Sequence, residues 1–181
     1  MSFRRAWTRF LRRGHTWPPT PGVREAWHQG RRDYHVWVIE LEGARDRRDR
    51  VYTALSPWLT PFCHDDPHVT VWVHGFAPPP LHPEEGRHVE IQLGGASSFA
   101  TCPFLEARCD ELRALRAGFS TPEKRWAGYL PHVTVGRYRQ RLVAREVAAA
   151  LAPFRRLPPI FVRGRFAHRI VDAFAEDGAF R

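Results

Sequence analysis

The pattern of apolar and polar residues divides the first half of the chain into strand, helix and strand. Residues 34–41 (YHVWVIEL) are rich in β-branched and aromatic side chains, which predicts a strand. Across residues 44–59 the apolar positions recur near a helical period with charges on the other face, which predicts a helix. A second strand is predicted over residues 68–76 (HVTVWVHGF), and the proline-rich stretch that follows ends it.

The second half of the chain repeats this order. The predicted elements are strands at 88–93 and 101–107 with a turn at Gly94-Gly95 between them, a short helix at 109–119, a strand at 132–139, a helix at 142–154, and one or two closing strands within 158–175. A strand, a helix and a strand that begins His-Val-Thr therefore occur twice. This order predicts an α+β domain of two pseudo-symmetric lobes of antiparallel sheet, with helices packed outside and an active-site groove between the lobes.

The string PHVTV occurs twice, at residues 67–71 and again at residues 131–135. Side chains alternate faces along a strand, so the valines of each copy share one face and the histidine and threonine share the other. The residues predicted on the polar face are His68, Thr70, Trp72 and His74 in the first copy, and His132, Thr134 and Gly136 in the second. If the two strands are neighbours, two imidazoles and two hydroxyls line one groove.

This set of side chains suits the cleavage of a phosphodiester. The reaction needs a base for the attacking oxygen and an acid for the leaving oxygen, and histidine serves in either role near neutral pH. Threonine hydroxyls donate hydrogen bonds to the non-bridging oxygens, and no metal or cofactor is required. A single HVT string is ordinary strand sequence, but two copies with matched flanks favour a catalytic pair.

The two motifs resemble those of the 2H phosphoesterases, a superfamily named for two H-x-T/S-x motifs on strands of two pseudo-symmetric lobes. The group includes the bacterial RNA 2′,3′-cyclic phosphodiesterases, also called the 2′-5′ RNA ligase family. There the first motif often continues to a glycine seven residues after its histidine, matched by Gly75, and the second to an arginine five residues after, matched by Arg137. EIQLGGASSF resembles the family's turn before a phenylalanine, here Phe99. The resemblance covers residues 34–171.

The resemblance implies the roles of four residues. His68 and His132 are the general acid–base pair, and Thr70 and Thr134 hold the phosphate. The implied substrate is a 2′,3′-cyclic phosphate on an RNA end or a nucleotide, opened by water to a phosphomonoester. Which histidine is the base stays open, as do two other activities: cleavage or joining of 2′-5′ linkages, and hydrolysis of a cyclic phosphate on another metabolite.

Two further residues are candidates for substrate contacts. His74 lies on the same predicted face as His68 and would line the groove. Strand alternation puts Arg137 on the face opposite His132, unless Gly136 forms a bulge that turns it round.

The net charge of the chain indicates what kind of partner it binds. The net charge is +9, and Lys124 is the only lysine, so arginine carries almost all of the positive charge. Arginine binds phosphates in a bidentate manner, which favours a phosphate-bearing partner such as RNA, although GC-rich coding also raises arginine content. A basic RNA-binding module that holds phosphate without turnover is therefore the alternative from a different class.

Residues 1–30 are predicted to be a separate basic segment, irregular and punctuated by prolines, ahead of a single bilobal domain over 31–181. The segment is either a flexible arm or folded over the domain, and Trp7, Phe10 and Trp17 stand between its basic residues as candidates for stacking on bases. No apolar run is long enough to span a membrane. The three cysteines form no CxxC pair and indicate reduced thiols, so we expect a cytoplasmic protein, taken as a monomer.

Two other constellations compete with the paired motifs. CHDDPH, residues 63–68, gathers side chains that ligate transition metals, but it has no second cluster, so a polar turn before the strand is the preferred interpretation. LGGASS, residues 93–98, lacks the lysine of a phosphate-binding loop and is interpreted as a tight turn.

Overall fold

The computed structural model describes residues 2–18, 29–60, 66–119 and 129–172. Its helices are α1 (Phe3–Arg13), α3 (Arg45–Leu55), α4 (Leu112–Ala117) and α5 (Ala144–Leu151), with two short 3-10 helices, η1 (Ser56–Trp58) and η2 (Ala152–Phe154). Its strands are β1 (Asp33–Leu41), β2 (His68–Gly75), β3 (His88–Ser98), β4 (Pro103–Arg108), β5 (His132–Thr134) and β6 (Ile160–Asp172). The fold is α+β, as predicted.

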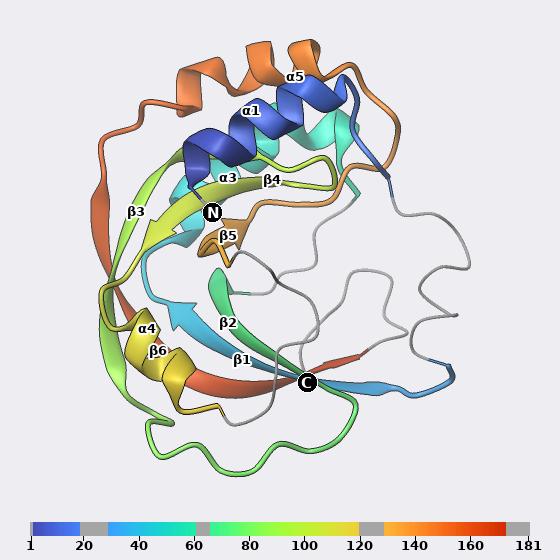
Figure 1. Cartoon of the computed structure of the whole chain (residues 1–181). Helices are drawn as coiled ribbons and strands as arrows, with labels where there is room; N and C mark the ends of the chain where they lie inside the picture. Colours follow the sequence, from blue (N-terminus) through green and yellow to red (C-terminus); the bar gives the residue numbers. More distant parts are fainter. Residues whose placement is uncertain (1, 19–28, 61–65, 120–128, 173–181) are drawn as a thin grey trace.

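The six strands form one closed barrel in the order β1-β2-β5-β4-β3-β6, and every neighbouring pair is antiparallel. The helices lie outside the sheet, with α1, α3 and α5 together on one side and α4 apart from them (Figure 1). None of the described helices is long and apolar enough to cross a membrane.

The barrel contains an internal repeat. Exchanging β1 with β4, β2 with β5 and β3 with β6 leaves the order of strands around the barrel unchanged. The helices follow the same rule, because α3 connects β1 to β2 and α4 connects β4 to β5. The registers agree as well: Glu40 pairs with His68 and Glu106 pairs with His132. The halves β6-β1-β2 and β3-β4-β5 therefore correspond to the two predicted lobes, and β2 and β5 meet at their boundary.

The valines of the repeated string anchor both strands in the core. Val69, Val71, Val133 and Val135 are all buried at 1% exposure or less. They belong to one cluster with apolar residues of α3 and α5, including Val51, Leu55, Val147 and Leu151. Burying a side chain of this size stabilises the fold by about 1.5–3 kcal/mol. The core thus fixes the valine face of each strand and leaves the histidine and threonine on the other.

The structure corrects the prediction for the N-terminus. Residues 3–13 were expected to be irregular, but they form α1, with Ser2 as N-cap and Gly14 in the left-handed conformation (φ 75°) that ends the helix. Ala6 and Phe10 are buried, so α1 packs on the barrel through one face. Within the segment expected to be irregular, residues 3–13 are therefore a helix folded against the domain, while the described residues 14–18 and 29–30 are not helical.

Three predicted strand features are also corrected. Gly94-Gly95 is not a turn, because β3 continues through it to Ser98 with a bulge between Leu93 and Ala96. The second HVT strand spans three residues, not eight. The pairing of β1 with β2 shifts register between Trp37 and Val38, so that Trp72 pairs with Trp37 and lies in the main core. Simple alternation of faces therefore fails beyond Thr70, because a bulge adds a residue to one strand.

Candidate active site

The two repeated motifs lie on neighbouring antiparallel strands. β2 and β5 pair at Val69 and Val133, the residues that follow the two histidines. This register sets His68 opposite Thr134 and places His132 opposite Thr70, all on the face away from the core valines. The two histidines are then diagonal neighbours, with backbones about 7–8 Å apart. That spacing leaves room for one phosphate group between the imidazoles.

Each imidazole is held by a main-chain carbonyl two residues earlier. His68 Nδ1 donates to the carbonyl of Asp66 (3.2 Å), and His132 Nδ1 donates to the carbonyl of Leu130 (2.8 Å). A carbonyl oxygen only accepts, so the hydrogen must sit on Nδ1 in both rings. In the neutral ring Nε2 therefore carries no hydrogen and can accept a proton as a base. In the protonated ring Nε2 carries the hydrogen that the ring can donate as an acid. The same arrangement in both lobes follows from the internal repeat.

His132 lies against an aromatic wall. The rings of Phe99 and Phe104 meet His132 in edge-to-face contacts, with centroids 5.1 Å and 5.3 Å away. Burial is the main cause that lowers the pKa of His132 below its ordinary value, and the nearby charge of His68 lowers it further. The hydrogen bond to Leu130 acts in the opposite direction but is the weaker effect. His132 is therefore neutral at neutral pH.

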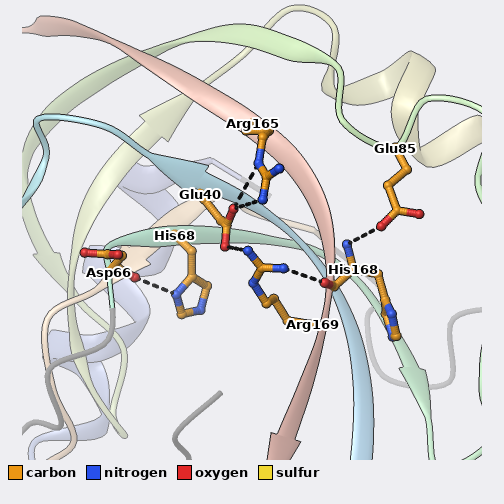
Figure 2. A network of polar contacts seen from close by, with 7 residues as sticks. All are labelled: Glu40, Asp66, His68, Glu85, Arg165, His168 and Arg169. Atoms are coloured by element: carbon orange, nitrogen blue, oxygen red, sulfur yellow. Dashed lines mark hydrogen bonds and ion pairs between the residues drawn. The ribbon is translucent and has the colours of Figure 1, made fainter. Parts of the chain in front are cut away.

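A carboxylate stands beside each histidine on the adjacent strand. Glu40 pairs in register with His68 and bonds two arginines of β6: Arg165 at 3.1 Å and 3.3 Å, and Arg169 (Figure 2). Its counterpart Glu106 is half-buried: burial raises the pKa of its carboxyl group, and the charges of Arg155 and Arg108 act in the opposite direction. The two halves of the site are thus alike in backbone, but Glu40 bonds arginines of the adjacent strand, whereas the arginines that act on Glu106 lie at the end of β4 and just after η2.

A hollow of about 420 Å³ adjoins His68. It is lined by residues of β1 and the turn after it, of the start of α3, of the segment before His68, and of β6: Glu40, Leu41, Glu42, Gly43, Arg45, Asp66, Pro67, Arg165 and Arg169. Arg45 bonds Asp66 across its rim. The hollow is polar, and its side chains are suited to the phosphate or sugar of a ligand.

Three residues of the site were not predicted from the sequence: Glu40, Arg165 and Arg169. A signal was present, because Glu40 is the single carboxylate in the predicted strand 34–41 and Glu106 is the single carboxylate in the predicted strand 101–107. The sequence contains no such signal for the two arginines, because their position beside His68 depends on the pairing of β6 with β1. Arg165 and Glu40, for example, lie 125 positions apart in the chain.

Thr70 and Thr134 are half-buried on the same face as the histidines. The main-chain carbonyl of Thr70 accepts a hydrogen bond from the hydroxyl of Tyr129 at 2.7 Å. Tyr129 comes two residues before the second PHVTV string, so this bond ties the segment leading into β5 to the strand that carries the first motif. It adds to the single register pair between β2 and β5.

His74, a candidate for the groove, has other neighbours. Its charge acts on His35 and His168, whose pKa values are both lowered, mainly by burial. His35 Nδ1 and His168 Nε2 are 3.0 Å apart, with the rings stacked at 5.1 Å. The register shifts of β2 remove the alternation that placed His74 on the face of His68.

Arg137 lies beyond the end of β5 and is exposed. Its carbonyl accepts hydrogen bonds from the backbone N–H (2.9 Å) and the hydroxyl (3.3 Å) of Thr60. Gly136 is buried against Leu59, where an added Cβ would come within 2.9 Å of a methyl group. The glycine thus serves close packing at this point.

Within the described residues, no three His, Cys, Asp or Glu side chains gather in a way that could hold a metal ion. Three residues of the candidate cluster CHDDPH, numbers 63–65, lie outside the described residues. Cys102 and Cys109 are free thiols.

Comparison with known proteins finds similarity in fold. No family model matches the chain, and no curated protein matches it. The structure is similar to solved structures that include a crystal structure of TT0787 of Thermus thermophilus, with a TM-score of 0.54 at 16% sequence identity. The match covers 82% of this chain and 93% of that chain. The two proteins therefore share the architecture over most of their length, and at this identity the likeness extends to the fold alone.

Proposed function

We propose that the protein is a metal-independent 2H-type phosphodiesterase that opens a 2′,3′-cyclic phosphate on an RNA end or a nucleotide. One observation carries the proposal: two HVT motifs pair across the lobe boundary, and each imidazole is oriented by a carbonyl two residues earlier. Two oriented imidazoles on opposite sides of one phosphate meet the requirement of in-line displacement for a base and an acid.

The surroundings of His132 support an assignment of the two roles. His132 is neutral at neutral pH because burial lowers its pKa, so its Nε2 takes a proton from the attacking water. The water oxygen bonds to phosphorus as the bond to one ribose oxygen breaks. His68, protonated, gives its Nε2 proton to that leaving oxygen. One water is consumed and one phosphomonoester forms, and exchange with solvent returns both rings to their starting states.

Thr70 and Thr134 donate hydrogen bonds to the non-bridging oxygens as charge develops on them. Each lies directly across from the histidine of the other strand, so each hydroxyl faces a phosphate held between the rings. The hollow beside His68 accommodates the part of the substrate next to the phosphate, within reach of Arg165 and Arg169.

The assignment of roles is tested by changing the leaving group. A p-nitrophenyl phosphodiester needs no proton on its leaving oxygen, whereas the ribose oxygen of a cyclic phosphate does. Without the acid, His68→Ala should lose about 10²- to 10⁴-fold in kcat on a 2′,3′-cyclic nucleotide and recover most of that loss on the p-nitrophenyl ester. His132→Ala lacks the base and should be impaired on both substrates.

His88→Ala is the matched control. His88 also opens a strand in the sequence His-Val, but it is exposed on β3 and bonds Arg163. It should retain activity on both substrates. The reverse pattern, with recovery in His132→Ala alone, would exchange the two roles, and equal losses in all three variants would refute the site.

A further inference from the structure

The helix α1 presents a surface of arginines next to the candidate site. Five of its eleven residues are exposed arginines: Arg4, Arg5, Arg9, Arg12 and Arg13. The first acidic residue in the chain is Glu25, so the helix carries no compensating carboxylate of its own. The arginines and Thr8 border an open hollow of about 610 Å³.

These arginines are concentrated on one helix without a carboxylate, whereas several arginines elsewhere on the molecule are neutralised by an acidic side chain. Arg45 and Arg165, for example, each bond a carboxylate. Among the described residues, no ion pair joins an α1 arginine to an acidic side chain. Five like charges on one helix face destabilise it slightly, since neighbours at i,i+4 repel. A polyanionic ligand would remove this repulsion, and within the described residues no carboxylate already does so.

Both ends of α1 connect to the aromatic wall of His132. At the first turn, Phe3 and Ala6 pack with Phe104, whose ring contacts His132. After the last turn, the backbone N–H of Trp17 donates to the carbonyl of Ala100 at 2.6 Å, next to the other wall residue, Phe99. The arginine surface therefore lies beside the half of the site that holds His132.

Trp17 extends this surface with an exposed aromatic ring. Its exposed fraction is 62%, and the guanidinium of Arg13 lies 4.8 Å from its ring centre. Of the three aromatic candidates in the N-terminal segment, Phe10 is buried and Trp7 is half-buried with Arg155 against its ring. Only Trp17 is available for stacking on a base.

The burial of the other helix face decides between two kinds of polyanion. A helix that binds a membrane surface inserts its apolar face into the lipid. In α1 that face, with Ala6 and Phe10, is already packed on the barrel. Arginines with an exposed tryptophan instead match the combination that binds single-stranded nucleic acid, a basic track with a stacking platform.

We propose that α1 and Trp17 form a docking surface for the strand of a single-stranded RNA whose terminal cyclic phosphate lies between His68 and His132. The inference rests on the proposed function and narrows its substrate to an RNA end in preference to a free nucleotide. The arginines contact backbone phosphates upstream of the reacting group, and Trp17 stacks on one base.

The test compares two substrates: a single-stranded RNA octamer ending in a 2′,3′-cyclic phosphate, and a 2′,3′-cyclic mononucleotide. Arg9→Gln/Arg12→Gln keeps good helix formers and removes two charges. It should lower kcat/KM on the octamer at least about 10-fold and reduce the salt slope of log kcat/KM by roughly 0.7 for each phosphate that the variant no longer neutralises. Trp17→Ala should cost about 10-fold on the octamer.

The mononucleotide does not reach the surface, so its kcat/KM should stay within about two-fold in these variants. The control Arg108→Gln/Arg113→Gln removes two exposed arginines, one at the end of β4 and one in α4, and should leave the octamer's salt slope unchanged. The helix α4 lies apart from α1 (Figure 1). Equal losses on both substrates would assign α1 a structural role and overturn the proposal, as would an unchanged rate on the octamer.

Direct binding separates this inference from the proposed function. If the wild type hydrolyses neither substrate, the proposed function fails, and fluorescence anisotropy with a labelled octamer ending in a 3′-phosphate still tests the surface. Weaker binding by Arg9→Gln/Arg12→Gln and by Trp17→Ala supports the docking surface. Binding that persists in those variants overturns it, and so does binding of anionic phospholipid vesicles in place of the RNA.

Discussion

Two adjacent glycines in β3 offer a matched test of how closely the barrel is packed. Neither Gly94 nor Gly95 has a positive φ, so alanine fits the backbone conformation at both. At Gly95 an added Cβ would lie 2.2 Å from the carbonyl oxygen and 2.6 Å from the carbonyl carbon of Arg155. At Gly94 the nearest atom would be the Cβ of Glu106, at an ordinary 3.4 Å.

The magnitude follows from which atoms must move. The contact at Gly95 has to open by more than an ångström against main-chain atoms just after η2, which have no rotamer to change. Overpacking costs about 1–3 kcal/mol, and we place Gly95→Ala at the upper end, near 3 kcal/mol. In a chain of this size that corresponds to a fall in Tm of about 6–12 °C. Gly94→Ala should be neutral, or more stable by up to about 1 kcal/mol, because alanine reduces the freedom of the unfolded chain.

Urea unfolding followed by tryptophan fluorescence, and thermal unfolding followed by circular dichroism, measure both variants against the wild type. Equal stability of the two variants would refute the close approach of β3 to the segment after η2. A loss confined to Gly94→Ala would reverse the inferred packing.

Two further properties follow from the buried titratable groups. The pKa values of His35 and His168 are lowered in the folded protein, so below the ordinary histidine pKa the unfolded chain binds more protons than the folded chain. The contribution to the free energy of unfolding should be complete above that pKa and should fall as the pH drops through it. The urea midpoints at pH 8 and pH 5 should therefore differ less in His168→Asn than in the wild type. An equal drop in both proteins would contradict this origin. Burial raises the pKa of Cys102 and of Cys109 to about 11, so in Cys63→Ser both thiols should react with Ellman's reagent at pH 8 far more slowly than in urea; equal rates would contradict it.

The candidate site was predictable from the sequence where it depends on short-range periodicity. Val69 and Val133 fix which face of each strand is buried, and that pattern is local. The repeated strand–helix–strand order likewise needs no knowledge of distant contacts. Because the two motifs occupy equivalent positions in the internal repeat, the strands that carry them could be expected to pair where the two lobes meet.

The features that the sequence analysis missed depend on contacts between distant segments. Gly94-Gly95 resembles a turn by composition, but Gly95 permits the close approach of Arg155, 60 positions further along the chain. The bulge in β2 that carries Trp72 into the core is set by its pairing with Trp37. Both features required the tertiary structure.

The helix α1 is a different case, because its signal was present in the sequence. Phe3, Ala6, Trp7 and Phe10 follow the spacing of one helix face, after Ser2 and before Gly14. The prolines at 18, 19 and 21 fall after the helix and led to an irregular prediction for the whole segment. The prediction for residues 3–13 was wrong because the irregular character of the proline-containing stretch was assigned to the residues before it as well.

The most direct test of the central claim is hydrolysis of 2′,3′-cyclic nucleotides, and of an RNA ending in a 2′,3′-cyclic phosphate, in the presence of EDTA. We expect turnover in the wild type with a bell-shaped pH profile, since one imidazole must be neutral and the other protonated. His68→Ala and His132→Ala should each lose activity by at least about 100-fold while His88→Ala keeps it. Turnover that EDTA abolishes, or that survives in both active-site variants, would contradict the account of a metal-independent histidine pair.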